Sequence, residues 1–364
     1  MGKRELLIIA AFVCVGIVAY ELTAPPPREG ERRFSLSALR DAFRRGGGPG
    51  VHATVTHEGL VPASASLTEI SIGGASAIIV TGEPRTDIAW TLAVDAAAAD
   101  DTAARRNADQ VTLGTDEMGS ILAMSVRVPR GIRQMATLTL HVPARLTVRV
   151  DGARRATVSS VGAVRLDGTA GEASVQQITG AVTGTHRNGV IAIADAGSIT
   201  LTLAGANATI DRTRGETAIE VRNGACQARD LAGSFTVDAS NASVDLTHAM
   251  GAARLTINGG RATVVEPRGA VRVDARNATV SATLERAVPL TTIATGGGVR
   301  LTLARETLPI AIDAVADPGT IVATDLGLTP DVHDRTATLR HTFGNDARVA
   351  LRIDGGEIVI TRTK

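Results

Sequence analysis

Aromatic residues are nearly absent from this chain of 364 residues, at 2% of the total, with one Trp and one Tyr. Enzymes that cleave polysaccharides combine clustered carboxylates with aromatic platforms for sugar rings. Trp90 and Tyr20 cannot form such a platform, because Tyr20 lies in an apolar N-terminal segment. The scarcity argues against a carbohydrate-processing groove and predicts a core of Val, Ile, Leu, Ala and Thr.

The chain also has few cysteines and almost no net charge. The chain has two cysteines and a formal net charge of +1. Cys14 lies in the N-terminal apolar segment and Cys226 lies at an apolar position of a strand-like phrase, so the two cannot pair and Cys226 is predicted to be a small core residue. The nearly neutral balance disfavours nucleic acid as a partner.

Catalytic and metal-binding patterns are missing from the sequence. His52 and His57 are an odd number of residues apart, which sends them to opposite faces of a strand. The aspartates do not keep the fixed offsets of calcium-binding repeats, and no Gly-x-Ser-x-Gly, P-loop or dinucleotide-binding motif occurs. We therefore predict no enzymatic activity, no catalytic, cofactor-binding or metal-binding residue, and no cofactor.

The chain does contain a repeated phrase of glycine, spacer, apolar, spacer, apolar. Successive starts are about nine residues apart, and such a short period indicates stacked units of strand and corner. Two phrases closing one turn predict an all-β, single-stranded β-solenoid (β-helix) with about 18 residues per turn. The phrases begin at Gly162, Gly171, Gly189, Gly197, Gly215, Gly233, Gly251, Gly260 and Gly269. Later phrases at 297–301, 308–312, 319–323 and 356–360 predict that the register continues to the C-terminus.

Alternation within each phrase predicts which side chains face outward. The apolar pairs, such as Val164 with Leu166 and Phe235 with Val237, share the inner face of a strand. Four arginines at intervening positions are predicted to form an outward basic strip if their turns stack in phase: Arg165, Arg254, Arg261 and Arg272. Such a strip would suit an anionic glycan or the acidic face of a partner protein. The competing interpretation is an ordinary solvated surface.

Asparagines recur at intervals close to one turn. Asn tolerates the left-handed backbone conformation of a tight corner better than other residues with a side chain, and stacked amides can form ladders. We predict one asparagine per turn at one corner, made by Asn188, Asn207, Asn223, Asn241, Asn258 and Asn277.

The N-terminal 50 residues are predicted to attach the chain to a membrane. Residues 1–5 form a cytoplasmic leader, residues 6–22 an apolar transmembrane signal anchor, and residues 23–50 a linker rich in Pro and Gly. A cleaved signal peptide is the alternative. Pro25 directly after Ala24 makes a poor cleavage site, so an uncleaved, single-pass anchor in the cytoplasmic membrane is favoured, with the bulk of the chain outside the cytoplasm in the periplasm or at the cell surface.

The remaining chain divides in two. Residues 51–150 are predicted to be a β-rich N-terminal cap section with strands at 67–72, 77–80, 88–94, 121–128, 137–142 and 146–150. One helix is predicted over Asp95 to Gln110, which is rich in Ala. Residues 151–364 are assigned to the β-solenoid with its C-terminal cap.

Roughly residues 65 to 364 resemble a bacterial family of putative adhesin domains of unknown function. The features that carry the resemblance are Val126-Arg-Val-Pro129, Leu140-His-Val-Pro143, the Gly-x-Val phrases and the tail from Phe343 to Ile360. The resemblance implies an all-β solenoid exposed in the envelope, with no agreed biochemical function and no catalytic residues. The corners depart from the family pattern, since Gly-Ala and Asn-Ala replace Gly-Asp or Gly-Ser.

These observations favour a membrane-anchored, non-enzymatic envelope protein whose β-solenoid surface serves adhesion, self-association or scaffolding. Its expected partners are the membrane through residues 6–22, an envelope protein or anionic glycan, and other copies of the chain. Two alternatives stay open: a solenoid carbohydrate-active enzyme, and an auxiliary or sensor subunit of a membrane complex.

Overall fold

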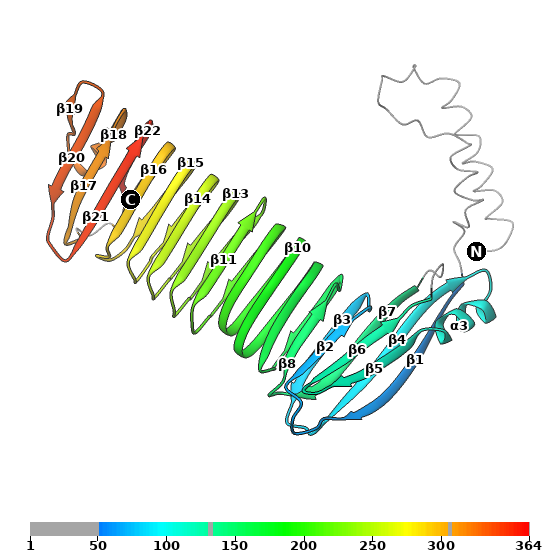
Figure 1. Cartoon of the computed structure of the whole chain (residues 1–364). Helices are drawn as coiled ribbons and strands as arrows, with labels where there is room; N and C mark the ends of the chain where they lie inside the picture. The colour runs from blue at the N-terminus through cyan, green and yellow to red at the C-terminus, as the bar shows by residue number, and fades with distance from the viewer. Residues whose placement is uncertain (1–50, 130–133, 305–307, 364) are drawn as a thin grey trace, which may run out of the picture.

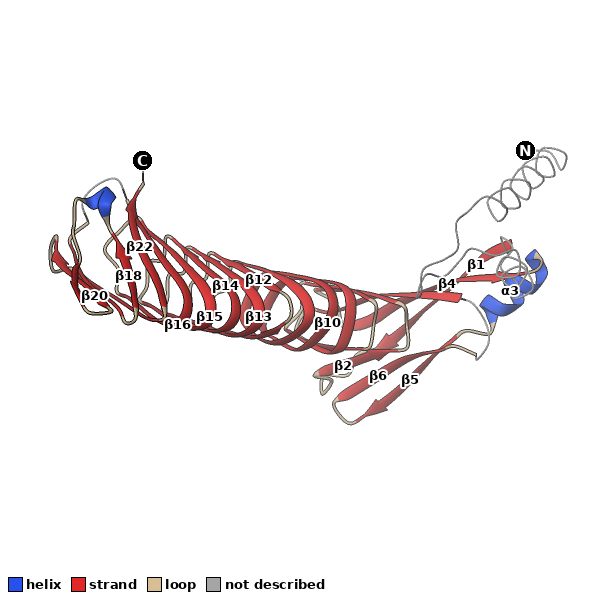
Figure 2. Cartoon of the chain, turned by 90° about the horizontal axis from the view of Figure 1, so that it is seen from above, coloured by secondary structure: helices blue, strands red, loops and turns tan. Residues whose placement is uncertain are grey.

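The computed structural model describes residues 51–129, 134–304 and 308–363. These residues form one elongated, continuous sheet of 22 strands, with an antiparallel N-terminal section at one end and coiled parallel strands along the rest (Figures 1 and 2). The described part contains one α-helix, α3 (Asp101–Asp109), and one short 3-10 helix, η1 (Thr324–Leu326). The predictions for residues 1–50 lie outside the described residues.

The N-terminal section consists of two antiparallel groups of strands and α3. One group pairs β1 with β4 and β4 with β7, and the other pairs β5 with β6. The Asp100 side chain caps α3 by accepting a hydrogen bond from the Ala103 backbone N–H at 2.8 Å. The strands are β1 (Val51–Pro62), β2 (Glu69–Gly73), β3 (Ala77–Glu83), β4 (Asp87–Ala98), β5 (Thr112–Met118), β6 (Ile121–Arg127) and β7 (Gln134–Pro143).

Two short strands join this section to the remainder. β2 lies parallel to both β6 and β8 (Thr147–Asp151), while β3 lies parallel to both β7 and β9 (Arg155–Ser159). β8 and β9 then pair in parallel with β10 (Ala163–Asp211). The N-terminal section is therefore hydrogen-bonded into the same sheet.

The central region, which we call the parallel stack, consists of strands whose parallel partners are 18 residues apart over most of its length. Ile199 aligns with Thr217, Thr217 with Phe235, and Phe235 with Ala253. Its strands after β10 are β11 (Thr217–Arg222), β12 (Ala225–Arg229), β13 (Phe235–Thr247), β14 (Ala253–Val265), β15 (Val271–Leu284) and β16 (Leu290–Leu303).

Aliphatic side chains fill the interior of the stack. Val164, Leu166, Phe235 and Val237 are at most 1% exposed, as the alternation of each phrase predicts. Cys226 is also fully buried, which confirms its prediction as a core residue. The largest fully buried side chain in the described residues is Phe235.

The predicted fold class is wrong and is corrected here. The fold of the described residues is all-β, with 72% strand and 4% helix, but its sheet holds a closed four-strand parallel barrel with extra strands and not a uniform single-stranded solenoid. The barrel closes through the parallel pairings β10–β11, β11–β13, β13–β12 and β12–β10. The reason is that β10 runs for 49 residues through its corners, so that a nine-residue phrase is not a separate strand.

One helix prediction differs from the structure, and another lies outside the described residues. No helix among the described residues has the length and apolarity needed to cross a bilayer, and the segment predicted to do so, 6–22, is not among them. The predicted helix over Asp95 to Gln110 is too long, because β4 continues to Ala98 before α3 begins at Asp101. Pairing of Ala96 to Ala98 with the start of β1 outweighs the helical propensity of that Ala-rich run.

The C-terminal strands do not follow chain order. β16 pairs with β21 (Ala347–Asp354) and β22 (Gly356–Arg362), and these separate it from β17 (Ile310–Ala316) and β18 (Gly319–Val322). β20 (Thr336–Thr342) is antiparallel to β17 and to β19 (Asp331–His333). The predicted unbroken register from 297 to the C-terminus is therefore wrong, because the last two strands insert between earlier ones.

The asparagine corner is present in part. Asn188, Asn223, Asn241 and Asn277 have φ between 49° and 53°, the left-handed conformation that the sequence predicted. Asn207 and Asn258 do not adopt it, and Gly205 and Gly259 occupy the corner in their turns, at φ 62° and 75°. A Cβ on either glycine would lie 2.8 Å from the side-chain oxygen of the asparagine one turn earlier, Asn188 or Asn241. Glycine thus follows Asn188 and Asn241 at this corner, whereas Asn241 itself follows Asn223 with a side chain in place.

Replacing Asn223 by Val is expected to lower the free energy of unfolding by about 1–2 kcal/mol, because a β-branched residue is strained at a φ of 53°. Chemical denaturation followed by circular dichroism measures the change. Asn258→Val is the matched control and should cost less, since Asn258 lacks the left-handed conformation. Equal losses in the two variants would contradict the role of the corner conformation.

Candidate functional site

The four arginines predicted to form one basic strip occupy separate places. Arg165 aligns with Arg149 of β8, whereas Arg254 aligns with Arg272 several turns further along the stack. Arg261 follows the corner of β14 and aligns with Ser243 and Thr279 in the other half of each turn. The strip is therefore wrong as predicted, and two stacked pairs of arginines replace it.

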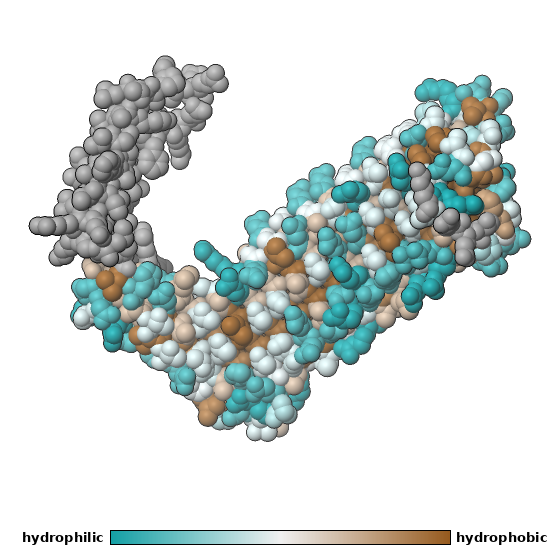
Figure 3. All heavy atoms as spheres, turned by 180° about the vertical axis from the view of Figure 1, so that it is seen from behind, coloured by the Kyte–Doolittle hydropathy of each residue, from teal (hydrophilic) through white to brown (hydrophobic). Residues whose placement is uncertain are grey.

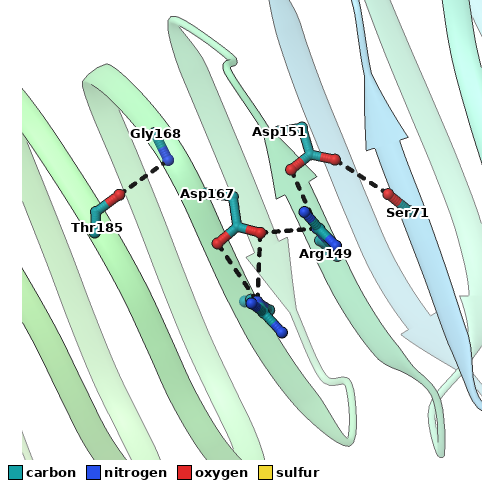
Figure 4. A network of polar contacts seen from close by, with 7 residues as sticks. Ser71, Arg149, Asp151, Asp167, Gly168 and Thr185 are labelled. Atoms are coloured by element: carbon teal, nitrogen blue, oxygen red, sulfur yellow. Dashed lines mark hydrogen bonds and ion pairs between the residues drawn. The ribbon is translucent and has the colours of Figure 1, made fainter.

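The first pair belongs to a polar network on the outer surface of β8 and β10 (Figure 4). The Nε of Arg149 lies 3.2 Å from Oδ1 of Asp151 and 2.8 Å from Oδ2 of Asp167. Arg165 contacts the same Asp167 oxygen at 3.3 Å, and the Ser71 hydroxyl donates to Oδ2 of Asp151 at 3.1 Å. The network ties β2 of the N-terminal section to the first two strands of the stack.

The electrostatics of this network favour the charged form of Arg149. The carboxylate of Asp151 raises the pKa of Arg149 above its usual value, with a smaller contribution from Asp167. The side chains of Arg149 and Asp167 are 37% and 28% exposed, so water screens their attraction. We therefore expect the network to orient the strands more than it stabilises them.

The second pair has the same arrangement. Arg272 makes two parallel contacts of 2.9 Å with the carboxylate of Asp274, and Arg254 approaches that carboxylate from the neighbouring strand at 3.8 Å. The hydrogen bond to Asp274 raises the pKa of Arg272. A carboxylate thus partly neutralises each stacked arginine pair.

The sequence carries a signal for these contacts that the strip prediction overlooked. An aspartate follows the arginine by two residues in Arg149-Val-Asp151, Arg165-Leu-Asp167 and Arg272-Val-Asp274. Residues two apart on a strand share one face, so each pair is adjacent before any folding into turns. In these three segments the outward surface therefore alternates charge along the strand, whereas like charges align between neighbouring strands.

A buried polar pair lies inside an early corner of the stack. His186 is fully buried, and its Nδ1 lies 3.1 Å from the Thr169 hydroxyl, while its Nε2 has no hydrogen-bond partner in the described structure. Burial lowers the pKa of His186 from 6.5, opposed by the Gly171 carbonyl. The neutral ring is the form that this site favours, which predicts a dependence of stability on pH.

Acidification below pH 6.5 is expected to destabilise the fold through His186. Because the pKa of the folded state lies below 6.5, the unfolded chain binds the proton more readily, and the free energy of unfolding falls as the pH drops towards the folded pKa. Above pH 6.5 this loss is absent. Urea denaturation between pH 5 and about 7.5 measures the slope, and His186→Gln should reduce it.

His333→Gln is the control for this titration, since the His333 side chain is 94% exposed. Its slope should match that of the unmodified chain. A slope that persists in His186→Gln would show that other groups cause the acid sensitivity.

The remaining candidate groups do not converge. Burial raises the pKa of the Cys226 thiol to about 12, so it is no nucleophile at neutral pH. His248 lies 3.1 Å from Asp230 through Nδ1 and 3.1 Å from Glu266 through Nε2, which points its two nitrogens at different carboxylates. Within the described residues, no group of three or more His, Cys, Asp or Glu side chains has an arrangement that could hold a metal ion.

Comparison with known proteins finds neither a matching family model nor a matching curated protein. Solved structures give only remote similarities, to bacterial proteins most of which are named putative adhesins. A putative cell adhesion protein from Clostridium sporogenes is 7% identical with a TM-score of 0.24, covering 85% of this chain and 100% of its own. A putative adhesin from Parabacteroides distasonis is 10% identical with a TM-score of 0.31, covering 87% and 98%.

A putative lipid binding protein from Parabacteroides distasonis is 11% identical with a TM-score of 0.30, covering 86% of this chain and 98% of its own. These identities and TM-scores are too low to assign a function to this chain.

Proposed function

We propose that this chain is a non-enzymatic protein of the cell envelope that binds other macromolecules through the outward faces of its parallel strands, for adhesion, self-association or scaffolding. The observation that carries the proposal is the division of each strand into a filled interior and a polar exterior. Val244 and Leu246 of β13 are buried, whereas the intervening Asp245 is partly exposed. Binding is therefore assigned to the exterior.

The outer surface suits reversible contacts with polar partners. Its apolar residues lie scattered among polar ones on the side seen in Figure 3, where no broad hydrophobic area is visible. Exposed large hydrophobic side chains of the described residues include Val190, Met250 and Ile293. A surface of this kind makes many hydrogen bonds and ion pairs without requiring a permanent partner.

The proposal places the chain at the cytoplasmic membrane, attached through residues 6–22 and with its bulk outside the cytoplasm. Support for this part comes from the sequence alone, in the apolar character of that segment. Intact-mass measurement of protein extracted from membranes tests it. Residues 1–24 should still be attached, and a chain that begins near Ala24 would show a cleaved signal peptide.

The carbohydrate-active alternative gains no support from the network described above. A glycosidase needs two carboxyl groups that face a common cleft. Asp151, Asp167 and Asp274 instead contact arginines on the outer surface.

The experiment compares the two outward faces of the stack in the full chain. Thr200→Glu with Thr236→Glu places carboxylates on one face, and Asn207→Glu with Thr279→Glu places them on the other, at positions that are all exposed. Recovery of proteins and glycans from native envelope extracts should fall several-fold for one double variant, while both keep the circular dichroism spectrum. Unchanged recovery with both would contradict binding through these faces.

A further inference from the structure

A surface cleft of about 780 Å³ lies at the corners of the first turns, where the N-terminal section meets the stack. Three glycines with left-handed φ line it, one each from the corners after β2 and β8 and from within β10: Gly74, Gly152 and Gly171. Gly152 directly follows Asp151 of the network in Figure 4. The cleft is large enough for a ligand of two or more sugar rings.

The glycines explain why the cleft stays open. A Cβ on Gly152 would meet no atom within 4 Å, so the missing side chain leaves space on the cleft side. A Cβ on Gly74 or Gly171 would overlap the backbone carbonyl oxygen of Val126 or Arg154. Close backbone packing therefore requires glycine at Gly74 and Gly171, whereas Gly152 leaves open space at its corner.

Two arginines of the cleft have their backbone N–H groups already bonded, so they can offer a ligand only their side chains. The N–H groups of Arg154 and Arg155 both donate to the Ser76 carbonyl at 3.2 Å. The Nε of Arg155 lies 3.1 Å from Glu172, whereas Arg154 is exposed and makes no ion pair with the described residues. One guanidinium at the cleft is thus available to an oxyanion.

Uncharged polar groups surround this cation. Ser76 and Thr137 contribute hydroxyl side chains to the lining. Gln134 also lines the cleft, and both heteroatoms of its amide are buried without a hydrogen-bond partner among the described residues. A buried amide without partners is costly, and rotation of the side chain towards a bound ligand removes that cost.

We propose that this cleft binds an acidic saccharide, with its carboxylate or phosphate on Arg154 and its hydroxyl groups on Ser76, Thr137 and Gln134. The guanidinium recognises an oxyanion through two N–H donors, and the hydroxyl and amide groups both donate and accept, as sugar hydroxyls require. This inference rests on the proposed function and names the ligand class and place of one binding site. It needs no aromatic platform, because recognition is polar.

The test measures binding of the full chain, extracted in detergent, to polygalacturonate by isothermal calorimetry at moderate salt. Arg154→Gln is expected to weaken binding roughly tenfold, the change that about 1.4 kcal/mol of lost interaction produces. Ser76→Ala should weaken it several-fold. Arg276→Gln removes the same charge from an exposed position in β15 and should change the affinity less than about twofold.

Two further polymers show which groups of the ligand the cleft recognises. Neutral dextran carries hydroxyl groups without charge and should not bind, and dextran binding equal to that of polygalacturonate would overturn the proposal. Polyphosphate distinguishes the source of the oxyanion. Weakening by Arg154→Gln towards polyphosphate assigns phosphate-bearing saccharides as well, and weakening only towards polygalacturonate assigns carboxylate sugars.

The outcome also distinguishes this proposal from the proposed function. Equal affinities of Arg154→Gln and Arg276→Gln would overturn the cleft as the binding site. The envelope-extract experiment would then still decide whether the outward faces bind. Absence of polygalacturonate binding, together with normal recovery from extracts, would remove the cleft and leave the proposed function standing.

Discussion

Replacement of Gly233 by Val is expected to destabilise the parallel stack by about 3 kcal/mol or more. A Cβ at this position would overlap the backbone carbonyl of Gly215 one turn earlier and lie 3.0 Å from the backbone nitrogen of Glu216. Backbone atoms held by parallel pairing on both sides cannot move aside as a flexible side chain would. The turns around β13 would have to separate, and hydrogen bonds between them would be lost.

Gly233 belongs to a column of glycines that repeats at each turn, with the carbonyl of one beneath the next. The column consists of Gly162, Gly180, Gly197, Gly215, Gly233, Gly251 and Gly269. Urea denaturation followed by circular dichroism measures the effect of Gly233→Val. Ala232→Val, one residue earlier and exposed, is the control and should change stability by less than about 0.5 kcal/mol. Equal midpoints for the two variants would contradict the close approach of the turns.

Replacement of Phe235 by Ala is expected to cost about 3–5 kcal/mol, the range for removing a buried aromatic side chain. Phe235 is 0% exposed, and its parallel partners Thr217 and Ala253 are both small. The ring therefore fills space that neighbouring turns leave empty, and those turns cannot collapse into the cavity without losing their register. Thermal unfolding of the full chain should show a lower midpoint.

Phe235→Leu provides the comparison for this prediction, because it leaves a smaller cavity at the same place. The loss of stability in Phe235→Leu should be clearly less than the loss in Phe235→Ala. In the double variant Phe235→Ala with Ala253→Phe, the ring would fill the same column from the next turn. Recovery of part of the lost stability would show coupling between the two positions, and additive losses would show that the column does not share one cavity.

The inner face of the stack was predictable because it depends only on alternation within one strand. Side chains two residues apart point the same way, so Val164 with Leu166 and Phe235 with Val237 were placed correctly, as was Cys226. Six strands predicted between residues 67 and 150 also correspond to strands of the structure. β1 and β5 were missed, and the exposed side chains of β5 show too little apolar alternation to mark a strand.

The candidate sites required contacts that a local pattern cannot specify. Whether Arg165 lies beside Arg254 or Arg149 depends on which strands are neighbours. One aspartate that contacts two arginines changes a basic strip into a partly neutralised network. The cleft beside Arg154 is even less predictable from the sequence. It is built from three corners whose glycines belong to segments separated by many residues.

The sequence by itself determined the local properties of this protein: strand-forming phrases, their inward and outward positions, and corners that accept a left-handed residue. Tertiary structure alone decided the order of the strands, because backbone hydrogen bonds can join any two strands in a compatible register, and the partners are selected only when the inner faces pack together. Two consequences follow. Strand β16 pairs with β21 and β22, and glycine takes the corner in two turns where asparagine was predicted, at Gly205 and Gly259. A corner side chain is tolerated only where the stacked residue one turn earlier leaves room for it, and that neighbour is known only once the turns have stacked.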